Sequence, residues 1–249
     1  MDDASSLAGW AALLADRTRA AFCLALLDGR AWTVGELARH AGVAVSTASE
    51  HADRLVAGGL LAQRKQGRHR YLQLSGPRVA ELIETVAGAP RPGSPAPVTS
   101  LSAAHRRRNL AYARTCYDHL AGFVGVALAD ALVARGHVSR SHGLVVTPRG
   151  VAWLAALGIA LDKSGKRPVV RECLDWTERR SHLAGTLGAA LCRHAFDAGW
   201  AERIGTGRAV RLTPAGVAAL EDQLGLVIEP ADRGSPGAAP AAPAVARRR

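Results

Sequence analysis

The chain has 249 residues and a net charge of +11, with 32 lysines and arginines against 21 aspartates and glutamates. Its length has room for two modest domains, and its charge favours polyanionic partners. Because no run of about 18 apolar residues occurs and Asp2 and Asp3 stand where a secretion signal would be basic, we expect a cytoplasmic protein without membrane contact. The cysteines lack CxxC spacing, which predicts reduced thiols: Cys23, Cys116, Cys173 and Cys192.

Residues 33–42 predict a short helix. Thr33 and Glu36 have the spacing of a capping box, in which each side chain bonds a free backbone N–H of the first turn. Gly42 can adopt the left-handed conformation that ends a helix. The apolar residues between them recur at helical spacing on one face: Val34, Leu37, Ala38 and Ala41.

A second helix should follow, and the sequence predicts that it reads DNA. We expect Ser46 or Thr47 to cap it, because Thr47 and Glu50 repeat the capping-box spacing. The predicted buried stripe is Val45, Ala48, Ala52 and Leu55. The opposite face is polar and can hydrogen-bond with bases or phosphates: Ser46, Thr47, Ser49, Glu50, Asp53 and Arg54.

Residues 63–71 predict a β-hairpin with Gly67 near its tip. Both arms carry cations that suit phosphate contact: Arg64, Lys65, Arg68 and Arg70. A basic hairpin alone is more often a solvated loop. Its position directly after a capped polar helix favours a DNA-contacting wing instead.

Residues 14–74 resemble an ArsR-family winged helix. The stretch LADRTRAAFCLALLDG is similar to that family's opening helices, SxxSxH occurs at Ser46, Ser49 and His51, and GRxRYxxL spans 67–74. The resemblance implies a homodimeric bacterial repressor that places residues 46–57 in the major groove of an operator with inverted half-sites and is released by a ligand. It also implies a backbone contact for His51, for which internal packing is the alternative.

The predicted contacts with double-stranded DNA are Ser46, Thr47, Ser49, Glu50, His51, Arg54, Arg64, Lys65, Arg68 and Arg70. The chain departs from metal-sensing ArsR members, because their paired cysteines would fall within 36–39, where no cysteine occurs. Their second ligand set would fall within 78–86, where only Glu81 and Glu84 could coordinate an ion. Neither familiar metal site is therefore expected.

Two segments of biased composition divide the chain. Residues 88–100, GAPRPGSPAPVTS, predict a linker, and the Ala-, Pro- and Gly-rich residues 230–249 predict a disordered tail. We therefore expect a winged helix-turn-helix DNA-binding domain at 1–87 and an effector and dimerisation domain at 101–229. The expected fold class is α+β, mainly α with small β-hairpins.

The region 101–229 contains an internal repeat. His119-Leu-Ala-Gly122 recurs as His182-Leu-Ala-Gly185, Arg-x-Cys-x-Asp occurs at 114–118 and 171–175, and two Thr-Pro pairs predict capped helices. Each copy predicts a helix, a hairpin and a helix, which suggests two winged-helix-like repeats. Their apolar first helices should be buried, with the copies packed about a pseudo-twofold axis. This organisation resembles a branch of ArsR-type actinobacterial regulators with a long C-terminal extension.

Two sites in the repeat are candidates for sensing a signal. One is a metal site, since Cys116 and His119 are three residues apart and could both face an ion from a helix; the candidate ligands are Cys116, His119, Cys173 and His182. Packing of small buried thiols is the alternative. The other is a pocket for a small organic effector around an inserted tryptophan: Trp176, Glu178, Arg179, Arg180 and His182. A charged helix start, with Trp176 covering the core, is the alternative.

Three functions remain in view. The first is a repressor released by a ligand that the C-terminal domain binds. The second is a thiol- or metal-responsive repressor, for a soft toxic metal, that uses Cys116 and Cys173. The third is an enzyme with a DNA-binding module, but the sequence shows neither a nucleophile with its base, nor a phosphate loop, nor HExxH. We expect no catalysis, and a metal ion is the one candidate cofactor.

Overall fold

The computed structural model describes residues 3–67, 69–88, 101–141, 143–162, 167–205 and 207–229. Arg68, nearly all of the expected linker and the expected tail lie outside these ranges. Within them, helices alternate with short antiparallel hairpins, which confirms the predicted fold class. No helix in the described ranges is long and apolar enough to cross a membrane.

The N-terminal part has the element order of a winged helix. Its elements are α1 (Asp3–Leu14), α2 (Arg17–Leu26), β1 (Trp32–Thr33), α3 (Val34–Ala41), α4 (Val45–Ala57), β2 (Leu61–Gln66), β3 (His69–Leu74) and α5 (Pro77–Gly88). The three strands form one antiparallel sheet in the order β1-β3-β2. Apolar residues from α2, α3, α4 and both wing strands form a single buried core, including Phe22, Leu37 and Leu55.

The predicted start and end of α3 are confirmed. The Thr33 hydroxyl accepts a hydrogen bond from the Glu36 backbone N–H, and the Glu36 carboxylate accepts one from the Thr33 N–H at 2.7 Å. Gly42 ends the helix with φ at 70°. The adjacent backbone N–H of Val43 bonds back to the Ala38 carbonyl at 3.1 Å, so the chain turns sharply into α4.

The predicted cap of α4 is wrong. The helix begins at Val45 with Ala44 as its N-cap, and no side chain caps it. The short turn from Gly42 leaves Ala44 in an extended conformation, so its carbonyl accepts the first helical bond, from Ala48, before Ser46 or Thr47 is reached. Val45 is 60% exposed rather than buried, and the buried stripe is Ala48, Ala52 and Leu55.

The predicted hairpin forms a two-stranded wing. Strands β2 and β3 pair along their whole length, from Leu61 opposite Leu74 to Gln66 opposite His69. Gly67 takes a φ of 58° at the tip, a conformation that favours glycine. Leu61, Leu72 and Leu74 are buried at the base, so the core anchors the wing while its outer arms stay exposed.

The C-terminal part repeats one order of elements, hairpin, helix, hairpin, helix, after a leading helix α6 (Leu101–Tyr112). The first copy is β4 (Arg114–Cys116), β5 (His119–Ala121), α7 (Gly122–Ala134), β6 (Val138–Ser139), β7 (Val145–Val146) and α8 (Pro148–Ala156). The second is β8 (Arg171–Leu174), β9 (Ser181–Ala184), α9 (Gly185–Asp197), β10 (Ala201–Arg203), β11 (Val210–Leu212) and α10 (Pro214–Leu224). Thr147 and Thr213 cap α8 and α10 before a proline, as predicted.

The expectation that Cys116 and His119 share a helix is wrong. They are paired across the hairpin of β4 and β5, with Tyr117 and Asp118 as its tight turn. Tyr117 has a φ of 61°, which is unusual for a non-glycine residue. The two side chains therefore lie side by side because of strand pairing and not because of helical spacing.

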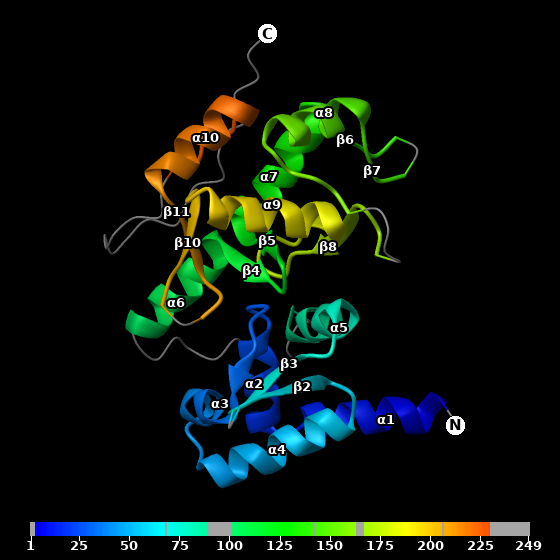
Figure 1. The fold of residues 1–249 in the computed structure, drawn as a ribbon, viewed down its shortest axis with the longest axis vertical. Helices are drawn as coiled ribbons and strands as arrows, with labels where there is room; N and C mark the ends of the chain where they lie inside the picture. The colour runs from blue at the N-terminus through cyan, green and yellow to red at the C-terminus, as the bar shows by residue number, and fades with distance from the viewer. Residues whose placement is uncertain are drawn as a thin grey trace.

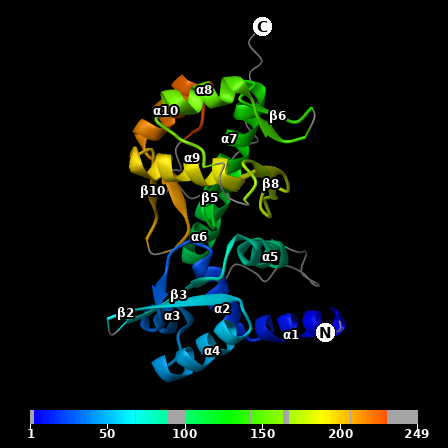
Figure 2. The same cartoon turned by 45° about the vertical axis from the view of Figure 1, so that its right-hand side comes forward.

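The two parts of the molecule stand one above the other, and α5 lies between them in both views (Figures 1 and 2). The α4 helix lies on the side of the N-terminal part that faces away from the C-terminal part (Figure 1). Each part has its own apolar core. This arrangement leaves α4 open to a large partner while α5 contacts the C-terminal hairpins.

Candidate functional site

The outer face of α4 presents the polar side chains that the sequence predicted as DNA contacts. Ser46, Glu50 and Arg54 are exposed, and Thr47 and Ser49 are half-buried. Because Ala48, Ala52 and Leu55 bind the helix to the core, the polar residues are held outward. A helix of 13 residues with such a face can enter the major groove.

The wing adds cations beside this face, and one of them is linked to α4. Arg64 and Lys65 lie on the exposed arm β2. The Arg70 guanidinium instead forms an ion pair with Asp53 of α4 at 2.6 Å. The sequence predicted a DNA contact for Arg70 and placed Asp53 on the polar face of the helix, but it did not indicate this pair, because the wing's fold back onto α4 is a tertiary feature. Arg68 lies outside the described residues.

The structure does not place His51 on the exposed face. Its side chain is 16% exposed, and its Nδ1 atom lies 3.6 Å from the carboxylate of Asp16. Asp16 in turn caps α2 by accepting the Arg19 N–H at 2.9 Å. His51 therefore packs between α4 and α2, which corresponds to the internal-packing alternative.

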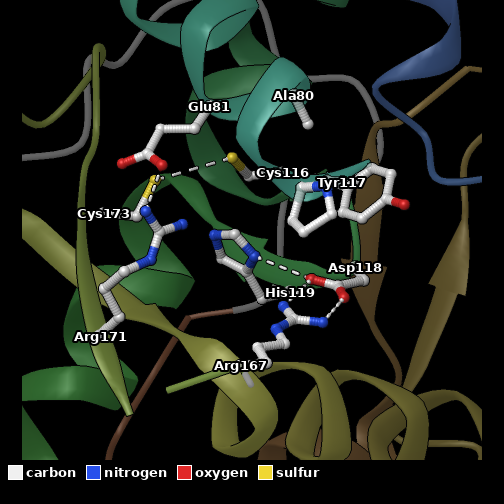
Figure 3. Close-up of a pocket in the computed structure, with 10 residues that line it drawn as sticks. Ala80, Glu81, Cys116, Tyr117, Asp118, His119, Arg167, Arg171 and Cys173 are labelled. Atoms are coloured by element: carbon white, nitrogen blue, oxygen red, sulfur yellow. Dashed lines mark hydrogen bonds and ion pairs between the residues drawn. The ribbon is translucent and has the colours of Figure 1, made fainter. Parts of the chain in front are cut away.

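A second site brings together four side chains from two hairpins. Cys116 pairs across β4 and β5 with His119, and Cys173 pairs across β8 and β9 with His182. We call these four residues the Cys/His cluster. All four are buried, and their ligand atoms lie within 4.8 Å of one another. The two sulfur atoms are 4.0 Å apart (Figure 3). The two Nε2 atoms are 3.1 Å apart.

Each histidine of the cluster has a carboxylate beside its Nδ1 atom. Asp118 lies 3.2 Å from Nδ1 of His119 and accepts two hydrogen bonds from Arg167, at 2.5 and 2.9 Å (Figure 3). Asp175 lies 3.3 Å from Nδ1 of His182. These carboxylates hold the imidazoles so that both Nε2 atoms point into the cluster.

Asp175 is itself fully buried and well held. It accepts hydrogen bonds from the Arg114 guanidinium at 3.1 Å and from the Gly122 backbone N–H at 2.6 Å. Arg114 belongs to the first copy of the repeat and Asp175 to the second, so the buried ion pair joins the copies. Hydrogen bonds and this positive neighbour outweigh burial and lower the pKa of Asp175 far below its usual range.

The thiols of the cluster differ from the other cysteines. Burial raises the pKa of Cys23 and of Cys192 to about 12, as expected for thiols in an apolar core. In the cluster, the hydrogen bond between the two thiols and further bonds with both imidazoles lower the pKa of Cys173. The same bond and burial raise the pKa of Cys116. The surroundings thus stabilise a thiolate, the form that binds metals.

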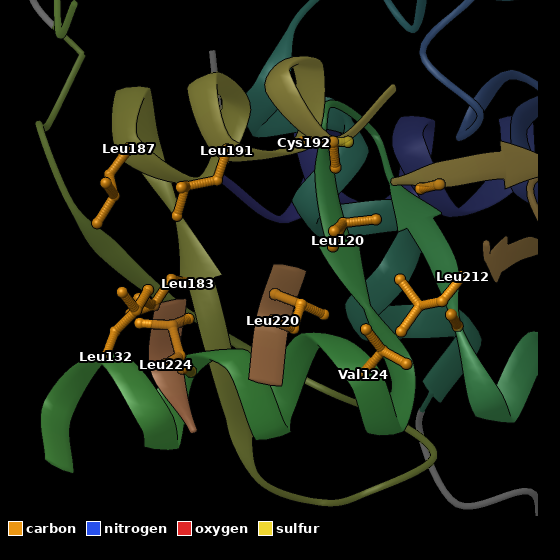
Figure 4. Packing of buried hydrophobic residues seen from close by; sticks show 14 of the residues in the cluster. Leu120, Val124, Leu132, Leu183, Leu187, Leu191, Cys192, Leu212, Leu220 and Leu224 are labelled. Atoms are coloured by element: carbon orange, nitrogen blue, oxygen red, sulfur yellow. The ribbon is translucent and has the colours of Figure 1, made fainter. Parts of the chain in front are cut away.

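Two glycines let the copies approach each other at the cluster. A Cβ atom on Gly188 of α9 would lie 3.1 Å from the Cβ of His119, and one on Gly125 of α7 would lie 3.7 Å from the Cβ of His182. Behind them, leucines from both copies share one core, including Leu120, Leu183 and Leu191 (Figure 4). The contacts are therefore reciprocal between the two copies.

Trp176 and His182, two of the residues predicted for an organic effector, both lie at the buried pair of Arg114 and Asp175. The Trp176 ring stacks against the guanidinium of Arg114 at 4.7 Å, so it covers a buried ion pair. Arg180 pairs on the surface with Asp130 at 2.7 Å, and Arg179 is exposed. His182 belongs to the Cys/His cluster. The small cavity beside the cluster is not lined by Trp176.

That cavity is lined partly by the N-terminal part, which sequence reasoning did not anticipate. Glu81 of α5 reaches toward the sulfur atoms and forms an ion pair with Arg171, two residues before Cys173 (Figure 3). Tyr117 and Arg167 complete the rim. The repeated Arg-x-Cys-x-Asp pattern was a signal for the cluster, whereas no local pattern indicates that α5 lies over it.

The fold and the outward polar face of α4 define a winged helix-turn-helix DNA-binding protein. A family model described as a helix-turn-helix domain matches residues 14–64. The uncharacterised HTH-type transcriptional regulator YdfF of Bacillus subtilis (strain 168) is 38% identical over 227 residues, which cover 90% of this chain and 99% of YdfF. The chain therefore belongs to the family of HTH-type transcriptional regulators. The predicted DNA-binding regulator is confirmed.

Two solved structures match about a third of the chain. NolR from Sinorhizobium fredii is 25% identical, with a TM-score of 0.32, over 34% of this chain and 84% of NolR. The homodimeric winged helix-turn-helix DNA-binding domain of a Mycobacterium bovis protein, described as a possible ArsR-family regulator, is 28% identical. Its TM-score is 0.32, over 35% of this chain and 84% of that fragment.

Proposed function

We propose that this regulator is an ArsR-type homodimeric repressor that binds DNA through α4 and the wing and is released by a signal bound in the C-terminal part. The observation that supports it most is the exposed polar face of α4 beside the free cations Arg64 and Lys65. In a dimer, two such helices would read the inverted half-sites of one operator.

Dimerisation has support in α1. This helix projects from the N-terminal core (Figure 2), and its Leu7 is 73% exposed. Trp10, Leu13 and Leu14 at its other end pack on the core, which holds the helix in place. A second copy of the chain would bury the exposed part.

The signal that we propose is a metal ion or a thiol reaction rather than an organic effector. The Cys/His cluster gathers four donor atoms in one buried place, while the residues around Trp176 are engaged in covering Arg114. We also propose that the residues predicted on α4 and the wing contact the operator. The proposed domains are the DNA-binding domain at 1–87 and the effector and dimerisation domain at 101–229.

Salt-titrated binding to duplexes that the protein selects from a random pool tests the DNA interface. We expect an R64A/K65A double variant to reduce the magnitude of the slope of log affinity against log salt by about 2. Each lost phosphate contact reduces that slope by about 0.9. A Ser49→Ala variant should change the selected bases and leave the slope unchanged.

The matched control is Arg193→Ala, which removes an exposed cation of α9 far from the reading helix. Its slope and affinity should equal those of the wild type. Equal slopes for R64A/K65A and the wild type would remove the wing from the interface, and failure to enrich any duplex would overturn sequence-specific reading.

A further inference from the structure

We propose that the Cys/His cluster binds one zinc-type divalent ion in tetrahedral coordination and that the turn between β4 and β5 reports its occupancy to the DNA-binding part. The regulatory half of this inference rests on the proposed function. The binding half does not, since it concerns side chains of the C-terminal part alone.

The distances fit a tetrahedral ion. With metal–sulfur bonds of about 2.3 Å and metal–nitrogen bonds of about 2.0–2.1 Å, a regular tetrahedron has S···S and N···N edges of about 3.8 and 3.3 Å. The corresponding separations in the cluster are 4.0 and 3.1 Å. These two edges differ from those of a regular tetrahedron by a few tenths of an ångström, and all four donor atoms already lie within 4.8 Å of one another.

The orientation of the imidazoles also suits an ion. Asp118 and Asp175 stand beside the two Nδ1 atoms, which favours a proton on each Nδ1 and a lone pair on each Nε2, and the two Nε2 atoms face each other at 3.1 Å. Two such lone pairs repel unless a cation or a proton lies between them. In proteins, metal-binding histidines commonly donate the N–H of their other ring nitrogen to a carboxylate.

The donor set selects the class of ion. Two thiolates and two imidazoles favour Zn²⁺ and its tetrahedral analogues Co²⁺ and Cd²⁺ over Mg²⁺ and Ca²⁺, which take oxygen ligands. Two thiolates also neutralise a divalent ion, which lowers the cost of burying it. Because all four ligands are buried and come from the protein, no position remains for a substrate, and the site suits sensing or stabilisation.

The ligands are joined to the DNA-binding part by the turn between Cys116 and His119. The Tyr117 backbone N–H donates to the Leu27 carbonyl at the end of α2, at 2.9 Å. The Tyr117 side chain packs against the N-terminal core. The turn contacts the backbone of Gly29 so closely that a Cβ atom there would lie 2.4 Å from the Tyr117 carbonyl oxygen.

Two further contacts connect the cluster to the N-terminal part. Arg171, two residues before Cys173, pairs with Glu81 of α5. Arg203 lies between the parts, 3.1 Å from the Asp28 carbonyl and 3.5 Å from the Thr115 hydroxyl next to Cys116. An ion that draws the four ligands together would therefore shift the contacts that position α2 and α5. Because α2 packs against α3 and α4, the shift would extend to the DNA-binding helix.

Co²⁺ titration of the reduced full chain tests the binding half. We expect one equivalent to produce the visible bands of tetrahedral Co²⁺ with thiolate charge transfer, and Zn²⁺ to displace it. The control variant C23A/C192A, which removes two other buried cysteines, should give the same spectrum, and C116A/C173A should give none. Weak octahedral bands, or the loss of the spectrum in C23A/C192A alone, would overturn the site.

Two measurements do not depend on the folding of a cysteine variant. In the wild type, where slow opening of the fold exposes the buried thiols to a reagent over hours, one equivalent of Zn²⁺ should slow the alkylation of Cys116 and Cys173 relative to that of Cys23 and Cys192. Asp118→Asn keeps all four ligands and should weaken Zn²⁺ binding about 10- to 100-fold. Equal labelling with and without Zn²⁺ would contradict the proposal.

DNA binding with and without Zn²⁺ tests the regulatory half. We expect a change in affinity for the selected duplex of at least fivefold in the wild type, typical of allosteric coupling, and none in C116A/C173A. If Zn²⁺ saturates the site and DNA affinity is unchanged, the β4–β5 turn does not couple zinc binding to DNA binding. Absence of DNA binding in every state would overturn the proposed function and leave the Co²⁺ result standing.

Discussion

Thr33 and Glu36 determine where α3 begins, because all of their hydrogen-bond partners lie within one helical turn. The hydroxyl and the carboxylate satisfy each other's backbone N–H groups within a single turn, so the spacing alone predicts the start of α3. Ser46 and Thr47 look equivalent in sequence, but the backbone turn after Gly42 starts α4 before them. A capping residue is effective only where the chain path permits the cap.

We expect Thr33→Ala to lower the free energy of unfolding by about 1 kcal/mol, because it removes a helix cap. Urea denaturation followed by circular dichroism measures the loss. Ser46→Ala is the matched control and should change stability by less than about 0.5 kcal/mol, since Ser46 is exposed and caps nothing. An equal loss for Ser46→Ala would contradict Ala44 as the N-cap.

Helices α7 and α9 show what decides packing at the scale of elements. Each is apolar around most of its circumference, as expected for helices buried on several sides. The glycines Gly125 and Gly188 let each helix pack closely on its preceding strand and on the histidine of the other copy. These glycines lie three residues beyond each HLAG segment, and only the assembled copies show what they contact.

Gly125→Ala and Gly188→Ala should each destabilise the chain by about 3 kcal/mol. The added Cβ atoms would lie 2.5 Å from the Leu120 carbonyl oxygen and 2.4 Å from that of Leu183. Relieving these clashes requires a shift of the backbone, which costs more free energy than a shift of a flexible side chain. The control is Gly35→Ala in α3, where nothing lies within 4 Å and stability should hold or rise by up to about 1 kcal/mol. Thermal unfolding measures all three, and a tolerated Gly188→Ala would contradict the packing.

At the scale of the whole molecule, α5 is the element on which both parts depend. It follows the wing in sequence, yet its Glu84 is 4% exposed and forms an ion pair with Arg208, just before β11. Together with Glu81 and the Tyr117 turn, this contact brings the Cys/His cluster next to the DNA-binding core. Separate sequence patterns for two domains do not reveal such a junction.

We expect Glu84→Gln to lower the free energy of unfolding by about 3 kcal/mol, because it leaves a nearly buried arginine without its counter-charge. Glu202→Gln removes the matching carboxylate from a half-exposed pair with Arg211 and should cost less than about 1 kcal/mol. Urea denaturation compares the two variants. Equal losses would mean that the junction contributes no more than a surface ion pair.

The candidate sites were predictable to different degrees. Helical spacing indicated the polar face of α4, and the repeated Arg-x-Cys-x-Asp and His-Leu-Ala-Gly segments indicated all four members of the Cys/His cluster. The reason given for Cys116 and His119 was wrong, because strand pairing and not a shared helix brings them together. The pairing of Arg70 with Asp53, the packing of His51 and the position of Glu81 depend on contacts between distant segments.

The sequence by itself determined the winged helix-turn-helix and the polar face of its second helix, because caps and hydrophobic spacing act over a few residues. Only the tertiary structure decided that the two cysteines and two histidines meet in one buried cluster and that α5 and the Tyr117 turn join it to the DNA-binding part. Those contacts result from the packing of two cores against each other. No local sequence pattern specifies which residues of the two cores come into contact.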